Sequence, residues 1–148
     1  VVAGYVDQAM SFLPEKGSPL GFITSQFNEG DQRSKSLLAG AGFATEKQDR
    51  AIAELSFGQR ARLGLLALRL QQPNFYLLDE PTNHVDIAGQ ERLEAEILEH
   101  EATCVLVSHD RRFVRGLGLR FLEIQRKRLV EVEGPEAFFA AAASEAGD

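Results

Sequence analysis

The sequence of 148 residues predicts an α/β domain built around a parallel β-sheet. Two continuous apolar runs, Phe75–Leu78 and Thr103–Val107, have the pattern of strands that are buried on both faces of a sheet. The segment Ile87–His100 lies between these runs and reads as a helix, so the three segments form a strand–helix–strand unit. Strands joined in this way pair in parallel. A short β-branched run at Val1–Val6 predicts a further strand.

The region after this first strand is expected to be mostly irregular. Five residues interrupt any regular period as far as residue 30, and they are Pro14, Gly17, Pro19, Gly21 and Gly30. We therefore expect a loop there. Asp31–Ala41 is predicted to be a short helix that ends at glycine residues. The polar segment Ala44–Glu54 favours no particular element.

The following elements have clearer patterns. Apolar residues recur at helical spacing from Leu63 to Leu70, so Gly58–Gln71 is predicted to be a helix that ends before Pro73. Asp86 is placed to cap the helix that begins at Ile87.

The C-terminal part is predicted to begin with a short helix from Asp110. Phe121–Ile124 and Arg128–Glu133 then have the pattern of a strand pair, and Pro135–Ala143 that of a small helix.

Composition excludes several classes of function. With 16 basic and 22 acidic residues, the net charge of -6 argues against a domain that grips nucleic acid through bulk charge. The basic cluster Arg111, Arg112 and Arg115 is interpreted as a solvated face. No apolar run reaches the roughly 18–20 residues that cross a bilayer, so no direct membrane insertion is expected. The single cysteine, Cys104, fits a reducing compartment such as the cytoplasm.

Polar residues follow both predicted core strands. Asp79 and Glu80 follow the first, and Ser108–Asp110 follow the second. The carboxyl ends of parallel strands meet at one edge of a sheet, where open α/β folds bind ligands. Adjacent strand residues point to opposite sides, so one carboxylate can hold hydrated Mg²⁺ while the other faces a reacting water. His109 could then hydrogen-bond a phosphate or that water.

A second candidate site lies at the start of the predicted helix Gly58–Gln71. Ser56 and Gln59 have the spacing of a capping box, which is common at ordinary helix starts. The same helix end could also bind an anion, because Gly58 lets a phosphate approach the free backbone N–H groups.

Four short motifs in this order resemble those of a known family. The motifs are LSFGQ (55–59), NFYLLDEP (74–81), TNHVD (82–86) and VLVSHD (105–110). They resemble the signature motif, Walker B motif, D-loop and switch histidine of the nucleotide-binding domains of ATP-binding cassette (ABC) proteins. TNHVD is similar to the TNHLD form typical of ABC-F proteins, which are soluble tandem-cassette ATPases that mostly act on ribosomes. One departure is Phe57, where the usual signature motif has glycine.

The resemblance implies the fold of a P-loop NTPase, with ATP and Mg²⁺ as cofactors. Asp79 would hold Mg²⁺ through water, and Glu80 would be the general base for the attacking water. His109 would bind the terminal phosphate. Gln8 matches the Q-loop glutamine and would sense the metal and the water.

The resemblance also implies partners. Ser56, Gly58 and Gln59 would close over nucleotide held by a second cassette, in the same chain or in a dimer. Asp86 would tie the D-loop to that second cassette, and the ribosome is a further possible partner.

The phosphate-binding motif G-x-x-x-x-G-K-[ST] does not occur in the sequence. We therefore expect the chain to be part of one cassette, with the missing N-terminal half as a partner, and to be inactive alone. Residues 1–8 would form the strand into the Q-loop, 9–72 an α-helical subdomain with the signature motif, and 73–148 the Walker B motif and the rest of the catalytic core.

Three functions remain open at this point. The first is an ATP-hydrolysing cassette of ABC-F type. The second is a transporter cassette, against which TNHVD weighs. The third is a truncated, non-catalytic module that lends its signature motif to another cassette.

Overall fold

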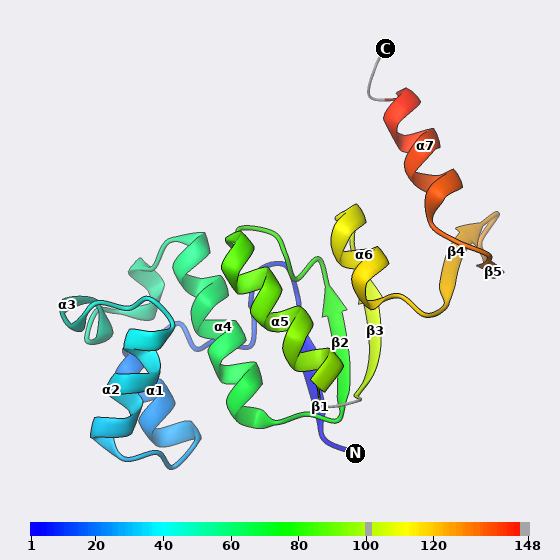
Figure 1. The fold of residues 1–148 in the computed structure, drawn as a ribbon. Coiled ribbons are helices and arrows are strands. Elements are labelled where there is room, and N and C mark those ends of the chain that lie inside the picture. Colours follow the sequence, from blue (N-terminus) through cyan, green and yellow to red (C-terminus); the bar gives the residue numbers. More distant parts are fainter. Residues whose placement is uncertain (100–101, 146–148) are drawn as a thin grey trace.

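The computed structural model describes residues 1–99 and 102–145, and its elements are shown in Figure 1. The strands are β1 (Ala3–Val6), β2 (Phe75–Asp79), β3 (Thr103–Val107), β4 (Phe121–Gln125) and β5 (Arg128–Val132). The α-helices are α1 (Pro19–Gln26), α2 (Asp31–Gly40), α3 (Thr45–Gln48), α4 (Phe57–Gln71), α5 (Ile87–Glu99), α6 (Arg111–Leu117) and α7 (Glu136–Glu145), and Ile52–Glu54 forms a 3-10 turn. The predicted helix end at His100 lies outside the described residues.

The central sheet has three parallel strands in the order β1–β2–β3. Val6 lies opposite Leu78, and Asp79 lies opposite Val107, so the carboxyl ends of the three strands share one edge. Strands β4 and β5 form a separate antiparallel pair. The predicted α/β class, with a parallel sheet, is therefore confirmed.

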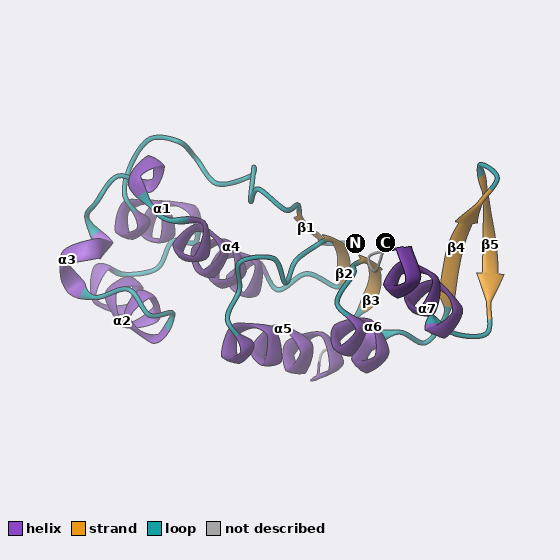
Figure 2. Cartoon of the chain, turned by 90° about the horizontal axis from the view of Figure 1, so that it is seen from above, coloured by secondary structure: helices purple, strands orange, loops and turns teal. Residues whose placement is uncertain are grey.

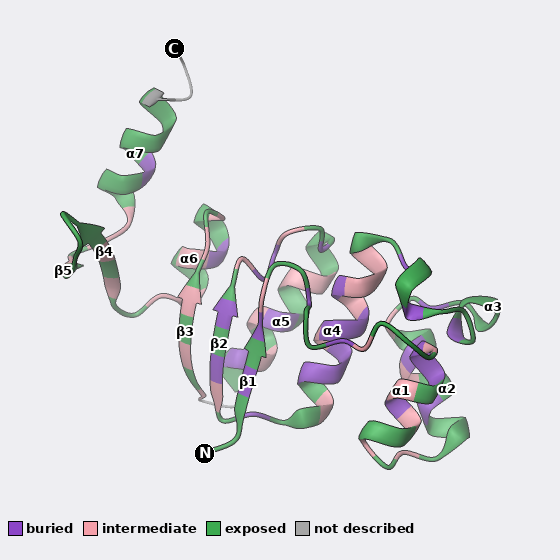
Figure 3. Ribbon diagram, turned by 180° about the vertical axis from the view of Figure 1, so that it is seen from behind, coloured by how far each residue is buried: buried purple, intermediate pink, exposed green. Residues whose placement is uncertain are grey.

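The sheet is covered on one face only within the part of the chain that the structure describes. Figure 3 shows β1, β2 and β3 from behind, with α4 and α5 on the far side. In β2, Tyr76 and Leu78 are buried, whereas Leu77, on the opposite face of the strand, is 39% exposed. The prediction that Phe75–Leu78 and Thr103–Val107 are buried on both faces is wrong for this chain, because only one side has a helical layer.

The helical region between β1 and β2 contains one helix, α1, where the sequence predicts a loop. Helix α1 begins with Ser18, whose hydroxyl oxygen accepts a hydrogen bond from the Gly21 amide at 3.2 Å, and with Pro19 in the first turn. Proline suits that position because its missing N–H would be unpaired there in any case. The expected loop is therefore wrong over Pro19–Gln26, where buried Leu20 and Ile23 pack into the core.

Helix α4 joins the helical region to the sheet. Its buried residues form the face that packs on both, and they are Ala61, Leu63, Gly64, Leu66, Ala67 and Leu68. Strand β1 approaches this helix closely, since a Cβ at Gly4 would lie 2.5 Å from Leu68 Cδ1. The predicted helix Gly58–Gln71 matches α4 to within one residue.

The C-terminal segment, β4–β5–α7, projects from the rest of the molecule beyond α6 (Figures 1 and 2). Arg111 of α6 donates a hydrogen bond to the Phe139 carbonyl at 2.9 Å, and its guanidinium lies 5.2 Å from the centre of the Phe139 ring. Arg115 pairs with Glu136 at 3.3 Å. Arg111, Arg112 and Arg115 are all exposed, as a solvated face requires, and Arg111 and Arg115 also hold α7 against α6.

Candidate functional site at the carboxyl edge of the sheet

Glu80 and His109 meet where β2 and β3 end. The Glu80 amide donates to the Val107 carbonyl at 2.8 Å, which extends the strand pairing by one residue. The His109 amide then donates to Glu80 Oε2 at 3.3 Å, and Glu80 Oε1 pairs with His109 Nδ1. The Glu80 side chain is 14% exposed and that of His109 is 77% exposed. The carboxylate is therefore held in place while the imidazole faces outward.

The backbone turns sharply at Glu80. Its φ of 49° lies in the left-handed region, which is unusual for a residue other than glycine. The Asn83 amide donates to the Glu80 carbonyl at 3.2 Å, so a tight turn follows the strand directly. This turn carries Glu80 out of the strand and places its carboxylate beside the end of β3.

Asp79 and Gln8 lie at the same edge. Asp79 is the last residue of β2 and is exposed, and Gln8 is exposed in the turn just after β1. Their carboxylate and amide oxygens fit Mg²⁺, which proteins usually hold through one or two carboxylates together with substrate phosphates. The described residues contain no cluster of three or more His, Cys, Asp or Glu side chains that could hold a metal on their own.

The turn that carries Gln8 is fixed by its neighbour Asp7. Both the amide and the hydroxyl of Ser11 donate to the Asp7 carboxylate. Partial burial acts to raise the pKa of Asp7, but these hydrogen bonds outweigh burial and hold the pKa below its usual value. The turn after β1 is therefore ordered by an ionised carboxylate.

The N-terminus of α4 has the capping box that the sequence predicts. The Gln59 amide donates to Ser56 Oγ at 3.3 Å, and the Ser56 amide donates to Gln59 Oε1 at 3.0 Å. Both side chains therefore satisfy local backbone groups in this structure. A bound anion would compete with the Ser56 hydroxyl for the same amides.

The start of α4 contacts the loop that follows Glu80. The Phe57 ring stacks on the His84 ring with a centroid distance of 5.2 Å and an interplanar angle of 25°. A Cβ at Gly58 would lie 3.2 Å from the His84 carbonyl oxygen, so the two backbones approach closely. The sequence identifies Phe57 only as a departure from the signature motif, and it predicts no contact between Phe57 and His84.

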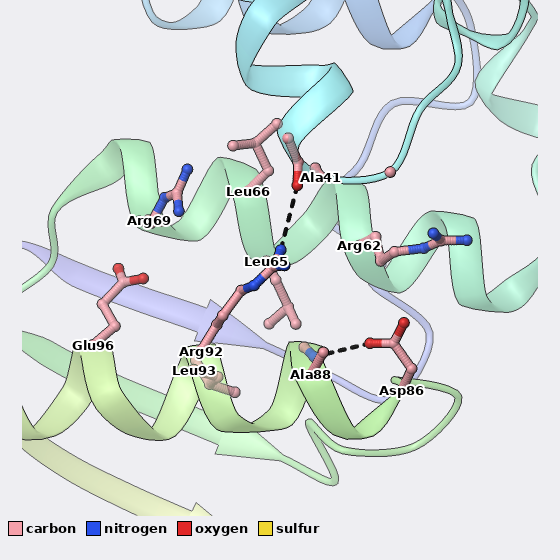
Figure 4. A pocket seen from close by; sticks show the side chains of 13 residues that line it. Ala41, Arg62, Leu65, Leu66, Arg69, Asp86, Ala88, Arg92, Leu93 and Glu96 are labelled. Carbon is pink, nitrogen blue, oxygen red and sulfur yellow. Dashed lines mark hydrogen bonds between the residues drawn. The ribbon is translucent and has the colours of Figure 1, made fainter.

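Asp86 closes the same loop and caps α5. Its Oδ1 accepts a hydrogen bond from the Gly89 amide at 2.8 Å. Figure 4 shows its carboxylate at one end of a pocket of about 170 Å³ that lies between α4 and α5 and is closed by the end of α2. Glu80 and His109 are not among the residues that line this pocket, so the candidate site is an exposed sheet edge.

Phe138 is a neighbour of His109 that the sequence does not predict. The two ring centroids lie 6.3 Å apart, and the Phe138 ring is partly exposed. This contact comes from α7, so the C-terminal helix reaches the edge of the candidate site. No local pattern in the sequence indicates such a contact, because it depends on how α7 docks.

A family model described as "ABC transporter" matches residues 2–83, which is more than half of the chain. The chain belongs to the ABC family. The match includes the strand β1, the helical region, and the residues Asp79 and Glu80 at the end of β2. Members of this family are in general ATPases that bind ATP and Mg²⁺.

Curated relatives of this ABC chain carry ABC-F names or are called ATP-binding proteins. "Putative ATP-binding protein YdiF" of Bacillus subtilis (strain 168) is 31% identical over 140 residues, which are 94% of this chain and 22% of that protein. "ABC transporter F family member 2" of Arabidopsis thaliana is 36% identical over 71% of this chain and 16% of that protein. "Probable ATP-binding protein YbiT" of Escherichia coli O157:H7 is 34% identical over 74% of this chain and 21% of that protein. The chain thus spans between 16% and 22% of these relatives.

Solved structures of ABC cassettes share the fold. The dimeric cassette MJ0796 in a post-hydrolysis state, bound to ADP and Pi, has a TM-score of 0.66 and 21% identity. That likeness covers 89% of this chain and 63% of the other. Among the described helices of this ABC chain, none has the length and apolar character needed to span a membrane.

Proposed function

We propose that this chain is part of an ABC-F-type cassette that binds and hydrolyses ATP in translation-related work in the cytoplasm, with the ribosome as a partner. The observation that carries the proposal is the contact between Glu80 and His109 at the ends of β2 and β3. The ABC-F names among the relatives support the subfamily and favour this function over a transporter cassette.

Glu80 is the proposed general base. Its carboxylate accepts a proton from the attacking water as the water oxygen bonds to the γ-phosphorus and the bond to the bridging oxygen of ADP breaks. The short tether of Glu80 to β3, through its amide and its carboxylate, orients it for that role. His109 would donate a hydrogen bond to the terminal phosphate from its outward-facing ring.

Asp79 and Gln8 would hold Mg²⁺ together with the phosphates, and the metal would neutralise charge on the phosphates. The phosphate-binding loop is not part of this chain, so the nucleotide would be cradled by the N-terminal half of the cassette. Residues 1–8, 9–72 and 73–148 would then be the Q-loop strand, the helical subdomain and the remainder of the core.

A second cassette is the proposed partner at the nucleotide. Ser56, Gly58 and Gln59 would close over ATP held by that cassette, and Asp86 would contact it. The dimeric state of the related MJ0796 structures supports such a pairing.

The test is Glu80→Gln in the complete protein that contains this chain. Glutamine keeps the size of the side chain and accepts hydrogen bonds but is not a base, so we expect turnover to fall by about 10²–10⁴-fold. ATP-dependent association should persist or become tighter. Phosphate release and sedimentation with ATP measure the two effects.

Glu91→Gln is the matched control, because Glu91 lies on the exposed face of α5 and pairs only weakly with Arg112 at 3.3 Å. It should leave turnover unchanged. Normal steady-state hydrolysis by the Glu80→Gln protein would remove Glu80 from the role. A complete protein that neither binds nor hydrolyses ATP would favour a non-catalytic interaction module.

A further inference from the structure

We propose that Phe57 and His84 form a positioning pair that holds the N-terminus of α4 against the loop 81–86. The inference rests on the proposed function, because it assigns a role to two residues beside the proposed composite ATP site. The pair acts through the neighbouring backbone: Phe57 follows Ser56, and His84 lies between Glu80 and Asp86.

The ring contact lies on the surface. Phe57 is 70% exposed, and His84 is exposed as well. Their centroid distance of 5.2 Å and angle of 25° are those of a stacked pair. A contact in this position adds little to the buried core, so its main effect is to fix the two segments relative to each other.

The backbone at the contact is tight and unusual. His84 has a φ of 61°, in the left-handed region that non-glycine residues adopt only when their surroundings hold them there. Its carbonyl oxygen lies where a Cβ on Gly58 would approach to 3.2 Å. The stack restrains the side chain of His84, and Gly58 leaves room for its carbonyl.

The remainder of the loop is anchored to α5. The Gln90 side-chain amide donates to the Thr82 carbonyl at 3.3 Å and to the Val85 carbonyl at 3.2 Å. These bonds flank His84 on both sides, and the Asn83 amide connects the loop to the Glu80 carbonyl. The loop therefore contacts α4 at His84. If α4 moves, His84 moves with it and displaces the neighbouring residues Glu80 and Asp86.

The chemical consequence is a change in turnover more than in ATP affinity. Losing the stack would let the loop 81–86 shift, and Glu80 with it through the bond from the Asn83 amide. Misplacement of a reacting group slows a reaction strongly. ATP binding by a cassette depends mainly on its phosphate-binding loop, whose motif does not occur in these 148 residues.

The experiment uses the complete protein with Phe57→Leu, His84→Leu and the double variant. Each single variant should lower kcat about tenfold while the KM for ATP changes less than about twofold. The double variant should be no slower than either single variant, because both remove one shared contact. Phe57→Tyr keeps a stacking ring at a position without a positive φ and should retain most of kcat.

Phe12→Leu is the matched control, since Phe12 is another partly exposed aromatic residue, on the connection between β1 and α1. It should leave kcat unchanged. If the fold-decrease in kcat of the double variant equals the product of the decreases in the two single variants, the two residues act independently. That result would overturn the proposal.

Amide hydrogen exchange gives a readout that does not depend on hydrolysis. The amides of Asn83 and Val85, which bond within the loop, should exchange faster in Phe57→Leu and not in Phe12→Leu. Unchanged exchange would overturn the positioning pair even if kcat fell. If Glu80→Gln leaves turnover unchanged while Phe57→Leu speeds the exchange of these amides, the proposed role of Glu80 in ATP hydrolysis would be overturned. The positioning pair would still be supported.

Discussion

A single substitution can separate the capping role of Ser56 from its proposed role at a second cassette. In this structure its hydroxyl oxygen accepts from the Gln59 amide at 3.3 Å and caps α4, and it is proposed to face nucleotide on a second cassette. We expect Ser56→Arg in the complete protein to block ATP-driven dimerisation and to leave nucleotide binding nearly unchanged. The lost cap alone should cost about 0.5–2 kcal/mol of stability. Sedimentation with ATP and thermal melting measure the two effects.

Ser18→Arg is the matched control for the cap, because Ser18 caps α1 through the Gly21 amide at 3.2 Å. It should lower the melting temperature by a similar amount and still dimerise. If Ser56→Arg lowers the melting temperature but the protein still dimerises normally with ATP, Ser56 has only the capping role.

Residue types at strand ends were predictable, and ring contacts were not. The order of apolar and polar residues around Asp79, Glu80 and His109 indicates the sheet edge, because parallel strands end together. The stack of Phe57 on His84 depends on the course of the loop after Glu80, including its positive φ values. Nothing in local spacing encodes such a path.

Helix α7 is held to α6 by arginine contacts. We expect Arg111→Ala to loosen α7, because it removes the hydrogen bond to the Phe139 carbonyl and the contact with the Phe139 ring. A hydrogen bond from a charged group contributes about 1.5–3 kcal/mol, so amide exchange in Glu136–Glu145 should accelerate by about tenfold or more.

Arg112→Ala is the control for this effect. Arg112 points toward α5, where it pairs with Glu91 at 3.3 Å and Glu94 at 3.8 Å. Exchange in α7 should stay unchanged in that protein. Equal acceleration in both variants would mean that α6 itself had loosened.

Element boundaries were predictable where periodicity is long. Helix α4 has regular apolar spacing from Leu63 to Leu70 and ends before Pro73. Helix α1 has eight residues and contains a proline and a glycine, so its composition resembles a loop. The signal that identifies it is positional: Ser18 at the N-cap followed by Pro19 in the first turn.

The exposed sheet face should govern how the 148 residues behave by themselves. Tyr5, Leu77, Val105 and Val107 are all more than one third exposed on these strands. We expect the isolated chain to self-associate, because apolar strand surface without a cover attracts a partner. Leu77→Lys should shift the chain toward monomer, as measured by light scattering.

Leu119→Lys is the control, since Leu119 is 96% exposed and lies outside the central sheet. It should leave the association unchanged. A monomeric wild-type chain at about 100 μM would contradict the expectation.

The isolated chain should also fail to hydrolyse ATP and should bind it weakly at best. Asp79 and Glu80 would bring two negative charges toward a triphosphate, and no G-x-x-x-x-G-K-[ST] loop is present to offset them. Calorimetric titration with MgATP measures the affinity. Micromolar binding by a monomer would show that the phosphate-binding loop contributes less than we infer.

The fold class was predictable as a whole, but the burial of the sheet was not. Continuous apolar runs such as Phe75–Leu78 indicate strands with cover on both faces. The structure has helices on one face, because the described residues supply only one helical layer. The sequence of a strand shows that its faces are apolar, but it does not show which other segment packs on each face.

The connections between the strands set an order of assembly for the sheet. Strands β2 and β3 are joined through α5 alone, whereas β1 reaches β2 only across the helices α1–α4. Closing a longer loop costs more chain entropy, and contacts between distant segments form late in folding. We expect β2–α5–β3 to form early and β1 to dock last, so the turn that carries Gln8 would reach the strand edge only in the final folding step.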